Sequence, residues 1–286
     1  MKRELRSRSA LVFAAACACL FAQASAAEAG VDLKMRTVVP GNEKASGSGR
    51  MRVEGTLLRI DLGAAPSGAG ATSLIFDGKN DVLRVVRHDD RSYVQIDEAA
   101  AAQLAGEMAE ARRQIDDQLA KMPEAQRKMI ERMLANGALP FPAPGGAAKK
   151  TPPLEAAATK EKDEVHDHSC RIVRLSRGGQ RKGDVCVAPY EAVGLVPDDL
   201  AVVKELGRFQ GKMTGALAGS VPGAEQPFEL LDRVDGFPLR TRRTEGGKVR
   251  SETFFEDIQK VEITPDTFEI WKGYERKELP SPKPPR

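Results

Sequence analysis

The clearest candidates for chemistry in this chain are two histidines and two cysteines: His166, His168, Cys170 and Cys186. Imidazole and thiolate groups are ligands that suit zinc and copper, so these residues could bind a metal. The His-x-His spacing differs from that of structural zinc sites, and an even number of cysteines in an exported chain favours a disulfide. We therefore predict a Cys170–Cys186 disulfide and no metal site. A metal-handling role of His166, His168 and Cys170 is the alternative.

Three pairs of neighbouring carboxylates could in principle serve as acid and base: Asp89-Asp90, Asp116-Asp117 and Asp198-Asp199. They fall at a predicted turn, on a predicted helix surface and at a predicted helix start, so each has a structural explanation. The chain contains no G-x-S-x-G, H-E-x-x-H or phosphate-binding glycine loop. We therefore predict that the protein is not an enzyme, and that it has no catalytic residues and no cofactor.

The first 26 residues have the three parts of an export signal. A basic start is followed by the apolar run LVFAAACACLFA and by the small-residue site Ala24-Ser25-Ala26. This pattern predicts a signal peptide over residues 1–26, cleavage after about Ala26 and a periplasmic location. A lipoprotein anchored at Cys17 is an alternative, although Ala14 stands where a signal of that kind would carry Leu.

The charge of the chain comes from this predicted signal. Four basic residues and one acidic residue give residues 1–26 a net charge of +3, and the whole chain also has +3. The mature chain is therefore neutral and lacks the excess of positive charge that attracts nucleic acid. No other long apolar run follows. We predict no nucleic-acid partner and no transmembrane span in the mature chain.

The stretch Ser73–Asp97 is predicted to form antiparallel strands, because its apolar and polar residues alternate. These strands are the first of the elements that would position a site. A turn at Asp89-Asp90 would place Val85 opposite Val94 and Leu83 opposite Ile96. These four side chains then share one apolar face, and polar residues occupy most of the other face. We predict a sheet of this kind with a single covered side.

A helical insert is predicted over residues 98–135. Asp97 is a candidate N-cap, and Pro123 separates a first helix from a second. Apolar residues recur at spacings of three and four, and several are methionines, whose flexible thioethers adapt to irregular surfaces. This stripe contains Leu104, Met108, Ile115, Leu119, Met122, Met129 and Met133. We expect the insert to cover the open side of the sheet.

Further strands are predicted on both sides of a flexible linker at residues 136–162, and Pro197 to Leu217 is predicted as another helix. Residues 51–63 are expected to form one strand that bends at Gly55. Residues 166–188 are expected to form a hairpin in which Cys170 faces Cys186 and Ser176 faces Gln180, with Val173, Leu175, Val185 and Val187 on the other face. Gly246-Gly247 predicts a second hairpin. TPDTFEIW is predicted as a last strand, and residues 277–286 as a disordered tail.

Several of these segments resemble a family of exported bacterial proteins of uncharacterised function. They are SLIFDGKNDVLRVVRHDDRSYVQID, the cysteine-bearing hairpin, GFPLRTRR and TPDTFEIWKGY. That family is similar to the LolA/LolB-like superfamily of periplasmic lipoprotein and lipid carriers. The resemblance spans about residues 30–276. It implies an α+β fold in which a strongly curved antiparallel sheet forms an incomplete β-barrel, with helices covering a concave face that holds acyl chains.

We therefore predict a single domain over residues 27–276 that acts as a non-catalytic periplasmic binding protein for a hydrophobic ligand, a lipid or an acyl chain. A lipidated protein is a further candidate partner. An envelope interaction or scaffolding module is the alternative. The residues predicted to line the half-barrel groove come from the helical insert and from the sheet: Leu104, Met108, Ile115, Leu119, Met122, Met129, Met133, Leu83, Val85, Val94 and Ile96.

Overall fold

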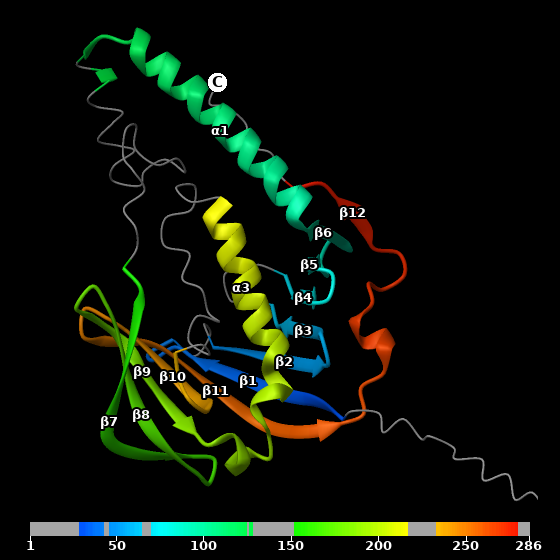
Figure 1. Ribbon diagram of the computed structural model, residues 1–286, viewed down its shortest axis with the longest axis vertical. Helices are drawn as coiled ribbons and strands as arrows, with labels where there is room; N and C mark the ends of the chain where they lie inside the picture. The colour runs from blue at the N-terminus through cyan, green and yellow to red at the C-terminus, as the bar shows by residue number, and fades with distance from the viewer. Residues whose placement is uncertain are drawn as a thin grey trace, which may run out of the picture.

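The computed structural model of the chain describes residues 29–42, 46–64, 70–124, 126–127, 152–216 and 233–279 (Figure 1). The predicted signal peptide, Met129, Met133 and the linker up to residue 151 lie outside these residues. Among the described residues, no helix combines the length and apolar character needed to cross a membrane.

The strands of the described residues form one twelve-stranded sheet that curves without closing (Figure 1). Its order is β12-β6-β5-β4-β3-β2-β1-β11-β10-β9-β8-β7, so β12 and β7 are the two edges. All neighbours are antiparallel except β12, which runs parallel to β6. The bounds are β1 Gly30–Val38, β2 Gly47–Glu54, β3 Leu57–Leu62, β4 Thr72–Asp77, β5 Val82–Arg87, β6 Ser92–Ile96, β7 Leu154–Val165, β8 His168–Arg177, β9 Gln180–Ala188, β10 Phe237–Glu245, β11 Lys248–Val261 and β12 Glu275–Lys277.

The alternation of apolar residues in β1 to β6 produces two continuous apolar rows across six strands. Because side chains alternate with period two, paired residues of successive strands lie on the same face. We call this face the inner face. One row is Val31, Val53, Leu58, Phe76, Leu83 and Ile96, and the other is Leu33, Met51, Ile60, Leu74, Val85 and Val94.

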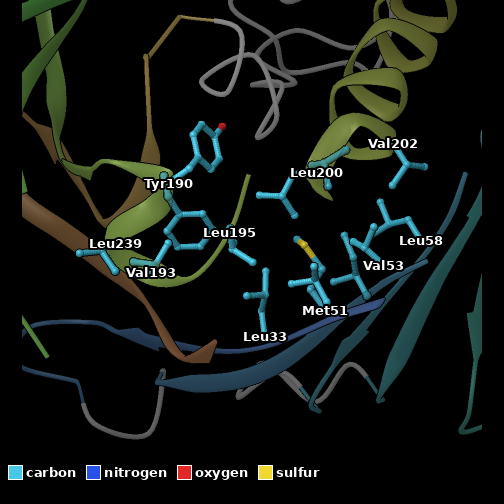
Figure 2. Close-up of a cluster of buried hydrophobic side chains, with 14 of the residues drawn as sticks. Leu33, Met51, Val53, Leu58, Tyr190, Val193, Leu195, Leu200, Val202 and Leu239 are labelled. Atoms are coloured by element: carbon cyan, nitrogen blue, oxygen red, sulfur yellow. The ribbon is translucent and has the colours of Figure 1, made fainter. Parts of the chain in front are cut away.

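A helical layer packs on this inner face. It consists of the 3-10 turns η2 Tyr190–Val193 and η3 Pro197–Leu200 and the helix α3 Ala201–Ala216. Leu200 and Val202 point from this layer toward Met51, Val53 and Leu58 on the strands (Figure 2). All five side chains are buried in the main core, which also takes in residues of β8 to β10. The burial of these apolar side chains is the main force holding the layer to the sheet.

The helix α1 Glu98–Lys121 begins directly after β6, where the Asp97 carboxylate caps it by accepting a hydrogen bond from the Ala100 N–H over 2.8 Å. It contacts β6 and α3. In Figure 1, α1 runs along the top of the molecule and extends beyond the sheet. Among the described residues, the helix whose side chains enter the core on the inner face is α3, whereas we expected the insert 98–135 to cover that face.

The predicted disulfide is present between Cys170 on β8 and Cys186 on β9, whose Cα atoms lie 5.3 Å apart. Both cysteines belong to the main core. The opposite face of the same hairpin carries a separate apolar cluster, as the alternation predicted. We call this the hairpin cluster; it contains Val173, Leu175, Val185, Val187 and Val234.

The register of the cysteine hairpin differs from our prediction. Gly178 and Gly179 both have positive φ and form a two-residue turn, so Arg177, not Ser176, pairs with Gln180. A register shift then follows at Gly183, where any side chain would overlap the Arg242 carbonyl. As a result Ile172 pairs with Cys186, and the disulfide joins the strands diagonally.

Three other predicted boundaries were wrong. Residues 51–63 are two strands, because Gly55 has a φ of +55° and starts a tight turn into β3 in place of a bend. Leu154–Val165 is strand β7, although residues up to 162 were predicted as linker. TPDTFEIW contains the 3-10 turn Pro265–Phe268 and no strand, and the last strand is β12, which extends to Lys277 in the predicted tail.

Candidate functional site

Burial of the two apolar rows falls toward β6. On β1 to β3 the side chains of both rows are fully buried, whereas Leu74, Val85, Val94 and Ile96 on β4 to β6 are only partly buried. At the end of β3, Leu62 continues the inner face and is 43% exposed. Among the described residues, the inner face is therefore covered less completely at β4 to β6 than at β1 to β3, although Leu74, Val85 and Ile96 still contact the main core. We call this partly covered area the open part of the inner face.

The position of α3 explains where the cover stops. Its residues Val202, Leu206 and Phe209 are buried, and the Phe209 ring packs against Phe76 on β4 with 5.4 Å between ring centroids. One turn further on, Met213 is only partly buried, although it still packs against the core. The adaptable thioether of Met213 thus lies at the limit of the covered area.

The predicted sheet residues of the groove meet as expected. Leu83 pairs with Ile96 and Val85 pairs with Val94, so the predicted register of this hairpin is confirmed. The residue with a left-handed backbone conformation in this turn is Arg91, whose φ is 47°. Neither of the two aspartates of the turn adopts that conformation. Leu83, Val85 and Ile96 all pack in or against the main core.

Of the predicted groove residues of the helical insert, the structure describes the side chains of Leu119 and Met122. Leu119 on α1 is buried and Met122, which ends the helix, is partly buried. Both are absent from the core that lines the inner face. The side chains of Leu104, Met108 and Ile115 lie outside the described residues, as do Met129 and Met133.

A pocket of about 400 Å³ lies between α1 and β12, away from the apolar rows. Polar and charged side chains such as Gln95, Gln103 and Arg276 line most of it. A lining of this kind suits polar groups and leaves an acyl chain without apolar contacts. The partly exposed apolar side chains therefore lie on the open part of the inner face and not in this pocket.

Sequence reasoning missed a polar cluster on the opposite, outer face of β3 to β5. Ser73 Oγ lies 2.5 Å from Asp61 Oδ1 and 2.7 Å from His88 Nε2, and His88 Nδ1 lies 2.9 Å from the Tyr274 hydroxyl. The buried Arg59 guanidinium donates to Asp61 over 2.7 Å and to the Thr267 carbonyl over 2.9 Å. We call these residues the outer polar cluster.

The hydrogen bonds of this cluster favour one direction of donation. If Ser73 donates its hydroxyl proton to Asp61, it accepts from His88 Nε2–H, and His88 Nδ1 then accepts from Tyr274. A serine nucleophile needs the reverse, with histidine accepting the serine proton. Ser73 is also 0% exposed. The sequence signal for this cluster is an Asp, a Ser and a His on facing strands. Their hydrogen bonds hold the strands and the C-terminal residue Tyr274 together.

The outer polar cluster holds the segment Ile263–Lys277 against the outer face. Ile263 and Phe268 pack there on Ile75 and Val86. Trp271 lies over the Arg59 guanidinium at 5.3 Å and beside the His88 ring at 4.9 Å, while 55% of it stays exposed. We call this segment the C-terminal strap.

Asp90 connects the strap's last strand to the sheet. Its carboxylate accepts hydrogen bonds from Ser92 Oγ over 2.5 Å and from Lys277 Nζ over 2.9 Å. These bonds favour the ionised form and lower the pKa of Asp90 from 3.8 to about 2. At neutral pH, Asp90 is therefore fully charged and joins β12 to the turn before β6.

The residues of the metal alternative do not converge. His166 lies in the turn before β8, 3.5 Å from Glu256, while Cys170 is bound in the disulfide. His168 is the first residue of β8. Within the described parts of the chain, no group of three histidine, cysteine, aspartate or glutamate side chains is placed to hold a metal ion.

A curved, unclosed antiparallel sheet with an apolar inner face is the class of structure defined by this geometry. No protein-family model and no curated protein matches the chain. Among solved structures, the chain is similar to a LolA superfamily protein, NE2245 from Nitrosomonas europaea, at 11% identity over 86% of this chain and 90% of that chain. The TM-score of this match is 0.22. A score of that size carries no argument about the site, which stands on this chain's own geometry.

Proposed function

We propose that this protein is a non-catalytic periplasmic binding protein whose ligand is a lipid or another molecule with an acyl chain. The observation that carries the proposal is the open part of the inner face, where the apolar rows continue past the cover of α3. Apolar surface that is left partly exposed next to a buried core is a usual setting of a hydrophobic ligand site.

The proposed ligand lies along β4 to β6 and contacts Leu74, Leu83, Val85, Val94 and Ile96. Leu62 extends this surface at the end of β3, and Met213 of α3 lines it from the opposite side. An acyl chain in this position removes apolar surface from water at about 25 cal/mol per Å². No reacting group is required, in keeping with a carrier that is not an enzyme.

Two measurements test this function. The first is solvent extraction and mass spectrometry of the protein purified from its native compartment, in which we expect a co-purified lipid. The second is titration with cis-parinaric acid, a fluorescent acyl-chain probe. A protein that carries no lipid and does not bind the probe would contradict the proposal. Reproducible recovery of one protein partner without lipid would favour the scaffolding alternative.

Matched variants test whether the probe binds at the open part of the inner face. Leu62→Glu and Val94→Glu each put a charge where the acyl chain would lie, so we expect roughly tenfold or greater loss of probe affinity. Val249→Glu is the control, because Val249 is a similarly exposed apolar residue at 36% but lies on β11, far along the sheet order from β4 to β6. Equal loss in all three variants would locate the binding elsewhere.

A further inference from the structure

The inner face carries a third row of paired residues beside the two apolar rows. We call the row from Val31 to Ile96 the first row and the row from Leu33 to Val94 the second row. The third row, on the same face because side chains alternate, is Met35, Gly49, Leu62, Thr72, Arg87 and Ser92. This row is apolar on β1 to β3 and polar on β4 to β6.

Met35 and Leu62 meet over Gly49, which confirms that these residues share one face. A Cβ atom at Gly49 would lie 3.1 Å from Met35 Cε and 3.4 Å from Leu62 Cδ2. The neighbouring pairs continue this row from Leu62 to Thr72 and from Thr72 to Arg87. The apolar surface of the inner face therefore ends at a polar border on β4 to β6.

Exposure rises across the three rows. In the first row Phe76 and Leu83 are buried, and the Phe209 ring of α3 packs on Phe76. In the second row Val85 is partly buried, and in the third row the Arg87 side chain is 58% exposed. An amphiphile that lies along β5 on this face would have its chain end at the first row, under α3, and its polar end at the third row.

Arg87 supplies a positive charge at this polar end. Its Nη2 donates to Asp89 Oδ2 over 3.4 Å and lies 3.5 Å from Asp90 Oδ2, and both contacts are long. Asp90 is held more closely by Ser92 and Lys277. A guanidinium has five N–H donors in a planar fork, so Arg87 can keep these contacts and also donate to carboxylate or phosphate oxygens.

We propose that the ligand of the inner face is an amphiphile whose anionic headgroup, a carboxylate or a phosphate, binds Arg87. This inference rests on the proposed acyl-chain function and adds the charge and the orientation of the ligand. The chain then runs from Arg87 over Val85 toward Leu83. Hydrogen bonds between a guanidinium and such an anion are short and directional, so Arg87 determines which end of the ligand faces solvent.

Two forms of one probe separate the headgroup from the chain. cis-Parinaric acid carries a carboxylate at about pH 8, whereas its methyl ester has the same chain and no charge. We expect Arg87→Gln to weaken binding of the acid by roughly 3- to 10-fold and to leave binding of the ester unchanged. Arg87→Lys keeps the charge and should retain part of the affinity for the acid. Fluorescence titration of the full mature chain measures all four affinities.

Matched variants make this test specific to the third row. Arg84→Gln removes the same charge from the same strand, but Arg84 lies on the outer face and should leave binding of the acid unchanged. Asp89→Asn removes a carboxylate that competes for Arg87, so it should tighten binding of the acid by roughly 2- to 5-fold. Circular dichroism checks that each variant keeps the native fold.

Competition against the probe distinguishes the two headgroups. Oleate presents a carboxylate and oleoyl lysophosphatidic acid presents a phosphate on the same chain. Loss of affinity for either competitor in Arg87→Gln supports the proposal, and the competitor that binds the wild type more tightly identifies the headgroup.

The outcomes also separate this inference from the proposed function. If both probes bind and Arg87→Gln changes neither affinity, or changes both equally, the headgroup does not bind Arg87. That result overturns the inference and leaves the acyl-chain function in place. If neither probe binds the wild-type protein, the proposed function is wrong and the inference fails with it.

Discussion

Ser73 shows how much of this structure depends on single polar contacts. Its hydroxyl joins Asp61 on β3 to His88 after β5, and His88 in turn holds Tyr274 of the C-terminal strap. A buried donor or acceptor that loses its partner costs its full desolvation energy. One hydroxyl therefore supports contacts between segments that lie about 200 residues apart in the sequence.

We predict that Ser73→Ala lowers the free energy of unfolding by about 1–3 kcal/mol, because it removes the hydrogen bonds that the buried Ser73 hydroxyl makes with Asp61 and His88. Urea denaturation measures this change. Trp271 is the only tryptophan in the chain and packs on the same cluster, so its emission should also shift as the strap loosens. Ser48→Ala, at an exposed position of β2, is the control. Equal stability of the two variants would mean that the cluster does not hold the strap.

At the scale of elements, we expect the attachment of β12 to depend on pH. The short parallel pairing of β12 with β6 is reinforced by the ion pair between Lys277 and Asp90. The pKa of Asp90 is lowered from 3.8 to about 2 by the Ser92 and Lys277 hydrogen bonds. A carboxyl with a lowered pKa in the folded state stabilises the protein above its unfolded-state pKa. That contribution is lost as the pH falls through the folded-state value.

We predict that wild-type stability falls more steeply than that of Asp90→Asn between about pH 4 and about pH 2. Urea midpoints measured at successive pH values test this, and the two curves should converge toward the acidic end. Asp266→Asn, at an exposed carboxyl of the turn Pro265–Phe268, serves as the control and should follow the wild type. Parallel curves for wild type and Asp90→Asn would show that the Lys277 contact contributes nothing.

Sequence reasoning succeeded where local pattern decides the structure. The alternation in Val82–Ile96 gave the correct pairing of Leu83 with Ile96, and Gly246-Gly247 gave the correct second hairpin. It failed where one glycine changes the register: Gly55 forms a turn between two strands, and Gly183 shifts the cysteine hairpin. Period-two patterns look alike on either side of a two-residue turn, so the turn itself is easily overlooked.

The site was harder to predict than the strands because it depends on tertiary packing. The sheet residues Val85 and Val94 follow from alternation, but the sequence does not show which helix packs on them. Both α1 and α3 carry apolar residues at helical spacing, and only the three-dimensional arrangement assigns α3 to the inner face. The outer polar cluster escaped for the same reason, since Tyr274 is 186 residues from its partner His88 in the sequence.

At the scale of the whole molecule, one core joins the two halves of the sheet. Leu33 and Met51 on β1 and β2 share this core with Cys186 on β9 and Leu239 on β10. The layer formed by η2, η3 and α3 lies between them, with Leu195 and Leu200 pointing into the same cluster (Figure 2). A sheet joined through a shared core in this way should unfold as one unit.

We predict a single cooperative unfolding transition, in keeping with one domain over residues 27–276. Trp271 fluorescence reports on the β3–β6 side, and hydrogen exchange of peptides from Ile172–Cys186 reports on the other side. Leu206 is fully buried in α3, so Leu206→Ala should lower the free energy of unfolding by about 2–5 kcal/mol and move both probes together. If the β8–β9 peptides instead exchange at an unchanged free energy while Trp271 responds, the two halves fold separately. The inner face would then lack the rigid support that a ligand site requires.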